Sequence, residues 1–211
     1  MIRSADWYFD FVSPYSYLQF KHFHRLPASL KINLVPVLFA GLLNHWGHKG
    51  PAEIPSKRVE MYRYCHWYAS RLGVPFRTPP AHPFNPLKVL RLTMALNSDH
   101  KTVETIFDHI WGQGHDIHSE DGFASLVHRL NVADVDQKIS SAGVKQALRD
   151  NTEQAVALGI YGTPTFVIDD VLFWGFDRME MLLEYLDDPG LFETEEMDRL
   201  GDIPMAAERR R

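Results

Sequence analysis

Two short stretches near the N-terminus have the residue pattern of strands, and a helical pattern lies between them. Residues 6–11 and 31–37 are rich in aromatic and β-branched side chains, which predicts two strands. Between them, a helix is predicted over residues 14–26, where Pro27 ends it. A strand, a helix and a strand within about 35 residues predict a βαβ unit with parallel strands and a right-handed crossover.

The middle of the chain has the apolar spacing of helices. Residues 39–55 are interrupted by glycine and proline, so we expect a loop there, with at most a short helical turn at 42–46. Further helices are predicted at 56–72, 85–96, 101–111, 119–130 and 144–158, with a weaker one at 134–141.

The strand pattern returns near the C-terminus. Residues 165–168 and 171–174 flank Asp169-Asp170 and predict a hairpin, and 177–186 predicts a final helix. The strands at the two ends of the chain are too few for two stable sheets, so they must combine into one. The predicted organisation is an α/β domain made of 1–40 and 150–190, an all-helical insertion over 41–149, and a charged, loosely ordered tail over 191–211.

Composition narrows the possible functions. The chain has 211 residues, of which 45% are hydrophobic and 23% charged, so it can bury a proper core. A net charge of -5 argues against nucleic acid and against a membrane surface as partners. Neither a signal-peptide pattern nor a bilayer-spanning apolar segment is present, so we expect a cytoplasmic protein.

Cys65 is the only cysteine of the chain, which excludes an intrachain disulfide and a Cys-x-x-Cys redox pair. A lone cysteine can act as a nucleophile. However, Met61, Cys65, Tyr68 and Leu72 fall at helical spacing on one apolar stripe. This setting favours core packing, because unpaired cysteine is among the most buried residue types.

The sequence Ser13-Pro14-Tyr15-Ser16 lies where the first strand meets the first helix. Pro14 suits the first helical position, and Ser13 stands at the N-cap. The hydroxyls of Ser13 and Ser16 are therefore expected among unpaired backbone N–H groups, where an anion can be held. A plain helix cap is the alternative interpretation of the same residues.

Several motifs together carry a family resemblance. Residues 9–16 (Phe-Asp-Phe-Val-Ser-Pro-Tyr-Ser), 47–58, 111–117 and 173–178 resemble, in this order, the motifs of 2-hydroxychromene-2-carboxylate isomerases. With Gly-Thr-Pro-Thr at 162–165, the layout is similar to the DsbA-like and kappa-class glutathione transferase group. The resemblance implies a thioredoxin-like α/β fold with a large helical insertion. It also implies a glutathione site between the sheet and the insertion.

The resemblance assigns roles to individual residues. Ser13 is similar to the serine that replaces a redox cysteine and contacts the glutathione sulfur, which makes it the catalytic candidate. Thr163 precedes Pro164, which is cis in this fold, and its backbone is expected to pair with the cysteinyl part of glutathione. Lys57 matches a basic residue of the glutathione site, although a solvated surface lysine is the alternative.

Further glutathione contacts follow from the same resemblance. Asp177 and Arg178 match residues near the γ-glutamyl end, and Asp177 alternatively caps the last helix. His48 stands where kappa-class relatives often carry asparagine. Phe176 stands where relatives often have a small polar residue, so only its backbone is carried over.

The histidines also raise the question of a metal site. The closely spaced pairs are His22 and His24, His45 and His48, and His115 and His118. None has the companion ligands of a zinc motif, so we expect no metal.

The resemblance implies a glutathione-dependent isomerase that interconverts 2-hydroxychromene-2-carboxylate and trans-o-hydroxybenzylidenepyruvate. A thiolate adds to the conjugated system, the former double bond rotates, and elimination releases the isomer. The expected partner is a small aromatic or otherwise electrophilic molecule, and a homodimer is a family expectation. Four aromatic residues are candidates to line the substrate pocket: Trp46, Trp67, Phe84 and Trp174. A kappa-like glutathione transferase or peroxidase and a non-catalytic thioredoxin-like binding module are the alternatives.

Overall fold

The computed structural model describes residues 3–207, so residues 1–2 and the last four of the predicted tail lie outside the described residues. The chain forms two compact units, Met1–Phe176 and Asp177–Arg211. All four strands of the described chain belong to the first unit. The boundaries predicted for the helical insertion stay a prediction.

The strands form one mixed sheet in the order β2-β1-β3-β4. Strand β1 (Ser4–Phe9) pairs in parallel with β2 (Lys31–Pro36) and antiparallel with β3 (Thr165–Ile168). Strand β4 (Val171–Trp174) completes a hairpin with β3, and Asp169 and Asp170 between them have positive φ. The predicted βαβ unit, the hairpin and the combination of both chain ends in one sheet are therefore confirmed.

In chain order, the helices of the first unit are α1 (Pro14–Phe20), η1 (Phe23–Arg25), α2 (Phe39–Trp46), η2 (Pro51–Glu53), α3 (Pro55–Leu72), α4 (Leu87–Ala95), α5 (His100–Phe107), the π-helical turn η3 (Asp108–Gly112), α6 (Glu120–Arg129), α7 (Val135–Ser140) and α8 (Ala142–Ala157). From α3 to α8, the helices of the first unit lie close to the predicted ranges.

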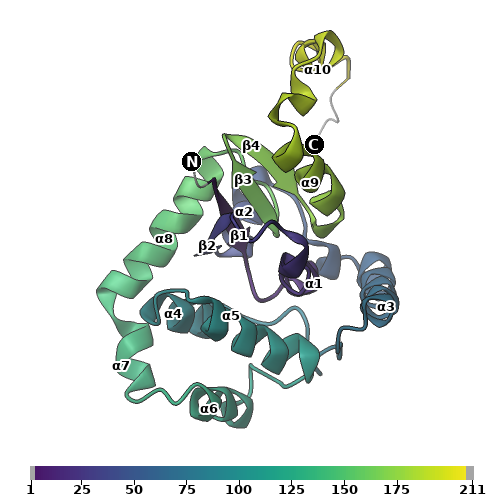
Figure 1. Cartoon of the computed structure of the whole chain (residues 1–211). Helices are drawn as coiled ribbons and strands as arrows, with labels where there is room; N and C mark the ends of the chain where they lie inside the picture. Colours follow the sequence, from purple (N-terminus) through teal and green to yellow (C-terminus); the bar gives the residue numbers. More distant parts are fainter. Residues whose placement is uncertain (1–2, 208–211) are drawn as a thin grey trace. The chain divides into compact units, whose positions relative to one another are not determined.

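Alternating side chains of β1 build a core on each face of the sheet. Trp7 and Phe9 stack with ring centroids 4.6 Å apart, and Phe107 of α5 packs against both. Tyr8 points to the other face, where it packs with Leu42 of α2 and Ala155 of α8. The sheet is thus covered by helices on both faces (Figure 1), and β1 is one of its two central strands and is largely buried.

Two predicted elements are wrong in extent. The helix expected over 14–26 ends at Phe20, and a 3₁₀ turn follows that places Phe23 against Trp7 at 4.9 Å. The loop expected over 39–55 is helical from Phe39 to Trp46. Gly41 is not a loop signal there, because a Cβ at this position would lie 2.9 Å from Thr152 Cγ2 of α8. The glycine allows α2 and α8 to approach closely.

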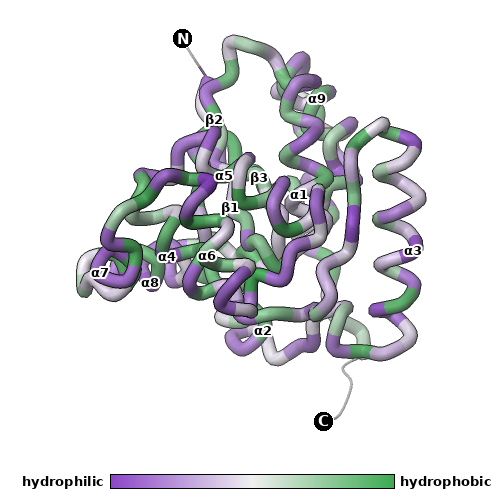
Figure 2. The backbone as a smooth tube through the Cα atoms, turned by 90° about the horizontal axis from the view of Figure 1, so that it is seen from below, coloured by the Kyte–Doolittle hydropathy of each residue, from purple (hydrophilic) through white to green (hydrophobic). Residues whose placement is uncertain are grey.

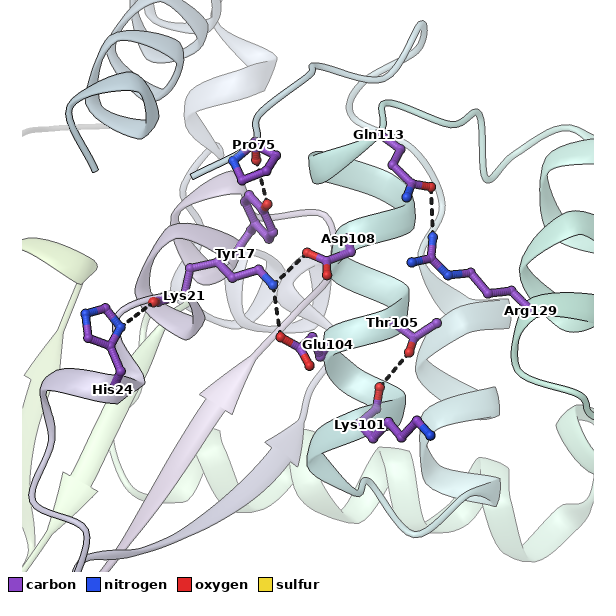
Figure 3. Close-up of polar contacts among 10 residues, drawn as sticks. All are labelled: Tyr17, Lys21, His24, Pro75, Lys101, Glu104, Thr105, Asp108, Gln113 and Arg129. Carbon is purple, nitrogen blue, oxygen red and sulfur yellow. Dashed lines mark hydrogen bonds and ion pairs between the residues drawn. The ribbon is translucent and has the colours of Figure 1, made fainter. Parts of the chain in front are cut away.

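Polar contacts hold α1 against the inserted helices (Figure 3). Lys21 Nζ lies 3.1 Å from Glu104 Oε1 and 2.8 Å from Asp108 Oδ1, so one ammonium joins α1 to α5 and η3. The Tyr17 hydroxyl donates to the carbonyl of Pro75 at 2.6 Å, in the segment that follows α3. The insertion therefore holds the helix that directly follows Ser13.

Helix α3 lies beside α1 with one buried stripe, and its hydropathy alternates along its length (Figure 2). Met61, Cys65 and Ala69 form that stripe, and Cys65 is fully buried. Burial raises the pKa of the Cys65 thiol, which disfavours the reactive thiolate. The prediction that this cysteine packs in the core is confirmed.

The second unit is helical. The turn η4 (Phe176–Arg178) leads into α9 (Met179–Asp187), η5 (Pro189–Phe192) and α10 (Glu195–Leu200). The expectation of a loosely ordered tail is wrong for α10, because Thr194 caps this helix by accepting the Met197 N–H at 3.2 Å. No helix in the described part of the chain is long and apolar enough to cross a membrane.

Candidate functional site

Ser13 forms the N-cap of α1, as predicted. Its Oγ accepts the backbone N–H of Ser16 at 3.2 Å, and Pro14 occupies the first helical turn. Since α1 is only seven residues long, its dipole is a minor source of positive potential. The hydroxyl and N–H groups around Ser13 are therefore the main donors that this junction can offer an anion.

Thr163 lies against Ser13, although 150 residues separate them in sequence. The Ser13 hydroxyl donates to the carbonyl oxygen of Thr163 at 3.3 Å, and both residues are buried. The Thr163-Pro164 peptide bond is cis, as the resemblance implied. The structure thus brings together the first and the late motif of the sequence at the end of β1 and the start of β3.

Two buried hydroxyls at this junction have no hydrogen-bond partner within residues 3–207. They are Ser16 Oγ and Thr163 Oγ1. A buried polar group without a partner costs about 1–3 kcal/mol, so native structures rarely leave one unexplained. Together with the long Ser13 bond, these two hydroxyls fit a site that a polar ligand completes.

Asp10 organises the loop between β1 and Ser13. Its carboxylate accepts the backbone N–H groups of Val12 at 3.0 Å and of Phe39 at 2.9 Å, while its own carbonyl accepts the Ser13 N–H at 3.1 Å. Asp10 is fully buried, and this burial raises the pKa of its carboxyl group to about 7, against the backbone hydrogen bonds that lower it. Asp10 thereby fixes the chain directly before Ser13.

The helical insertion holds the same loop from the other side. Trp111 Nε1 donates to the carbonyl of Phe11 at 2.8 Å, and His82 Nε2 lies 2.8 Å from the carbonyl of Val12. The peptide units from Asp10 to Ser13 therefore have partners for both their N–H and C=O groups. Neither His82 nor Trp111 was predicted as part of the site.

His82 is held as a neutral imidazole. Because a carbonyl only accepts, Nε2 carries the proton, and Nδ1 accepts a hydrogen bond from the Tyr62 hydroxyl at 2.8 Å. Burial lowers the pKa of His82, and the charge of Arg58 lowers it further. The Val12 carbonyl therefore fixes the tautomer of His82, and the Tyr62 hydroxyl of α3, which also lies 3.2 Å from the His82 carbonyl, holds the ring from the other side.

Aromatic side chains flank the junction on the side of α3. Phe176 stacks on Tyr15 with ring centroids 5.3 Å apart and contacts Tyr68 at 5.0 Å. Tyr64 and the exposed Trp67 continue this group along α3. The side chain of Phe176 thus packs beside α1, whereas the family resemblance predicted a role only for the Phe176 backbone.

The four predicted pocket aromatics do not form one cluster, because each packs against a different neighbour. Trp46 donates its Nε1–H to the carbonyl of Ile160 at 2.9 Å, and Trp174 packs on Tyr161 at 4.9 Å. Phe84 is buried against His82, and Trp67 lies on α3. Trp67 alone among the four belongs to the aromatic group around Phe176.

The remaining predicted residues lie outside the hydrogen-bonded junction. Lys57 is exposed in the first turn of α3, and His48 is exposed between α2 and η2. In the described chain no hydrogen bond or ion pair joins either residue to Ser13. Their roles stay predictions.

Asp177 and Arg178 belong to the second unit and form an ion pair with each other at 2.5 Å. The alternative that Asp177 caps the last helix is wrong. The N-cap of α9 is Arg178, and no side chain caps this helix, because Asp177 lies one residue earlier inside η4.

The closely spaced histidine pairs are the remaining candidates for metal-binding side chains. Within residues 3–207, no group of three histidine, cysteine, aspartate or glutamate side chains is placed to hold a metal ion.

Known proteins are similar to this chain over most of its length. The model of the DSBA-like thioredoxin domain matches residues 5–187. Glutathione S-transferase kappa 2 of Caenorhabditis elegans is 30% identical over 209 residues, covering 89% of this chain and 93% of that protein. A 2-hydroxychromene-2-carboxylate isomerase of Sphingobium xenophagum is 26% identical, covering 89% of this chain and all of that protein.

A solved 2-hydroxychromene-2-carboxylate isomerase has the same fold. It superposes with a TM-score of 0.78 at 21% identity, over 96% of this chain and all of that one. With a family model spanning most of its length and relatives that match nearly end to end, the chain belongs to the DsbA-like thioredoxin family, among the kappa-class glutathione transferases and 2-hydroxychromene-2-carboxylate isomerases.

Proposed function

We propose that this protein is a glutathione-dependent enzyme whose site is centred on Ser13. One observation carries the proposal: a buried hydroxyl stands at a helix start beside the backbone of Thr163, and the chain has no thiol of its own there. The only cysteine, Cys65, is buried in α3. A thiol that reacts at this junction must therefore arrive with a ligand.

The residues of the junction suit the sulfur and peptide groups of glutathione. The bond from Ser13 Oγ to the Thr163 carbonyl is long, so the hydroxyl can turn toward a sulfur at little cost. A hydrogen bond donated to the charged form lowers a thiol pKa from its ordinary value of about 8.5. The unpartnered hydroxyls of Ser16 and Thr163 supply further polar contacts.

We assign the other contacts as proposals. The backbone of Thr163, followed by cis-Pro164, pairs with the cysteinyl part of the tripeptide. Lys57, His48 and the backbone of Phe176 complete the binding site. Asp177 and Arg178 bind the γ-glutamyl end.

For the reaction, we propose cis–trans isomerisation of a conjugated aromatic acid, as in 2-hydroxychromene-2-carboxylate isomerases. Bound glutathione would supply a thiolate that adds reversibly to the conjugated double bond and so allows rotation. Ser13 stabilises the thiolate, and the loop from Asp10 to Val12 fixes Ser13 in place. The aromatic group of Tyr15, Phe176 and Tyr68 offers an apolar surface for a flat substrate.

A second candidate is a kappa-like glutathione transferase or peroxidase. The 30% identity to the Caenorhabditis elegans kappa 2 protein supports it. Rates with 2-hydroxychromene-2-carboxylate and with a chloronitrobenzene, measured side by side, separate the two reactions. A third candidate is a non-catalytic thioredoxin-like module. We also propose that the protein forms a homodimer, is located in the cytoplasm and acts on a small electrophilic molecule.

Calorimetric titration with glutathione tests the proposal, and S-methylglutathione is the matched ligand without a free thiol. We expect both to bind, and only glutathione to give the ultraviolet absorption of a thiolate near neutral pH. Ser13→Ala should weaken that absorption and leave S-methylglutathione affinity within about twofold. No binding of either ligand at millimolar concentration would favour the non-catalytic module. Binding with an unchanged thiolate signal in Ser13→Ala would refute the role of Ser13.

A further inference from the structure

A groove of about 680 Å³ lies between α2, α4 and α8, and it includes none of the residues assigned to glutathione. Its lining includes Gly41 and His45 of α2 together with residues of α4 and α8. This volume lies within the range of small-molecule sites in proteins.

Most of the charged side chains that line the groove are positive. Arg91 of α4 and Lys145 and Arg149 of α8 contribute three cations, against the single carboxylate of Glu153. In the described part of the chain none of the three cations forms an ion pair. The excess of cations favours an anionic ligand.

Arg91 gives the second, independent indication of a ligand. Its Nε is buried and has no hydrogen-bond partner within residues 3–207. Guanidinium groups bind carboxylates through two parallel hydrogen bonds, and Nε is one of the donors that such a pair uses. Arg149 and Lys145 are exposed one turn apart on α8, so they form the rim while Arg91 lies deeper.

The remaining lining is aliphatic. Leu38 of the β2–α2 connection and Leu87, Leu148 and Val156 of the helices supply branched apolar side chains. Thr152 is not a free polar contact, because its hydroxyl donates to the Leu148 carbonyl and accepts the Leu38 N–H. An occupant must therefore combine an anionic head with an apolar body.

We propose that this groove is a binding site for an aliphatic carboxylate. The carboxylate group of the ligand binds Arg91, and its alkyl chain packs on Leu148 and Val156. The site is distinct from the junction at Ser13, so it does not depend on the proposed function. The carboxylate of Glu153 repels an anionic ligand. Removing one of the cations should therefore weaken binding, whereas removing the Glu153 carboxylate should strengthen it.

Titration of the full chain with octanoate, followed by calorimetry and by backbone amide chemical shifts, tests the site. Octanamide is the uncharged control ligand. We expect octanoate to shift the amides of Gly41, Leu148 and Thr152, and octanamide to bind at least tenfold more weakly. Arg91→Gln should weaken octanoate binding by about tenfold and Arg149→Gln by about threefold, while Glu153→Gln should strengthen it by about threefold.

Lys101→Gln is the matched control, because it removes an exposed cation on α5 outside the groove. It should leave octanoate affinity unchanged. The proposal is overturned if octanoate does not bind at millimolar concentration, or if Arg91→Gln and Arg149→Gln weaken it no more than Lys101→Gln. Displacement of octanoate by glutathione would also overturn it, since that would place the ligand at the Ser13 junction.

Discussion

His82 donates its Nε2–H to the carbonyl oxygen of Val12 across 2.8 Å, and Val12 directly precedes Ser13. Replacing His82 with alanine leaves this carbonyl without its partner, so the peptide unit before Ser13 can rotate and displace the hydroxyl. We expect His82→Ala to raise the thiol pKa of bound glutathione by about one unit. Ultraviolet titration of the thiolate measures this shift.

His82→Gln is the matched variant, because its side-chain amide can still donate to a carbonyl, and it should recover part of the shift. Tyr62→Phe should give a smaller shift, since it removes only the hydroxyl that holds the His82 ring and leaves the bond from His82 to Val12 in place. A folded His82→Ala protein with an unchanged thiol pKa would contradict this role. If Ser13→Ala also leaves the thiol pKa of bound glutathione unchanged, the proposed glutathione site itself is contradicted.

Trp111 donates a hydrogen bond to the carbonyl of Phe11, and Trp111→Phe measures how much this bond contributes to stability. The phenyl ring keeps most of the packing but cannot donate to the buried carbonyl of Phe11. We expect the free energy of unfolding to fall by about 1–3 kcal/mol, measured by urea denaturation. Trp46→Phe is the control, because the half-exposed Trp46 makes the same type of bond, to Ile160, at a place that water can reach. Equal losses in both variants would contradict the argument.

The local chemistry of the site could be predicted from the sequence. Ser13 and Pro14 are residue types that helix starts require, and Pro164 lies before a clear hairpin pattern. The contacts of His82 and Trp111 could not be predicted in this way, although Trp111 begins the motif at 111–117, because their partners are backbone carbonyls, which carry no sequence signal. The rule used for Gly41 failed for a related reason: its role depends on Thr152, which is more than one hundred residues away.

Asp10 makes stability depend on pH. Its folded-state pKa of about 7 lies above the ordinary value of 3.8, so its contribution is fully present below pH 3.8 and is lost as the pH rises through 7. The slope is at most about 1.4 kcal/mol per pH unit. Asp10→Asn should remove this slope. It should also lower stability by about 1–3 kcal/mol, because an amide nitrogen would then face a backbone N–H of Val12 or Phe39. Guanidinium denaturation of both proteins between pH 4 and 8 measures the difference.

Cys65 should take no part in the chemistry. Its thiol is fully buried, and burial raises its pKa, so we expect no labelling by a thiol reagent unless the protein unfolds. Cys65→Ala should bind glutathione as tightly as the parent chain and keep the same turnover rate. A loss of turnover in a folded Cys65→Ala protein would contradict a ligand-borne thiol. Ser13→Ala, assayed in parallel, shows the size of loss expected for a true site residue.

His109 gives a pH dependence of the opposite sign. It stacks on His115 with ring centroids 4.2 Å apart, and Nε2 bonds the carbonyl of Gly122 at 3.0 Å. Burial, with the charges of His115 and Arg129, lowers the pKa of His109 from 6.5 to about 4. A lowered folded-state pKa stabilises the protein above pH 6.5, and this contribution is lost as the pH falls through 4.

We therefore expect the chain to lose about 2–3 kcal/mol relative to His109→Gln as the pH falls from 7 to 4, because glutamine donates to Gly122 without titrating. His115→Gln should narrow the window by removing one cause of the lowered pKa. Denaturation curves at half-unit pH intervals measure all three proteins. Parallel curves for the parent chain and His109→Gln would show that His109 keeps an ordinary pKa in the folded protein.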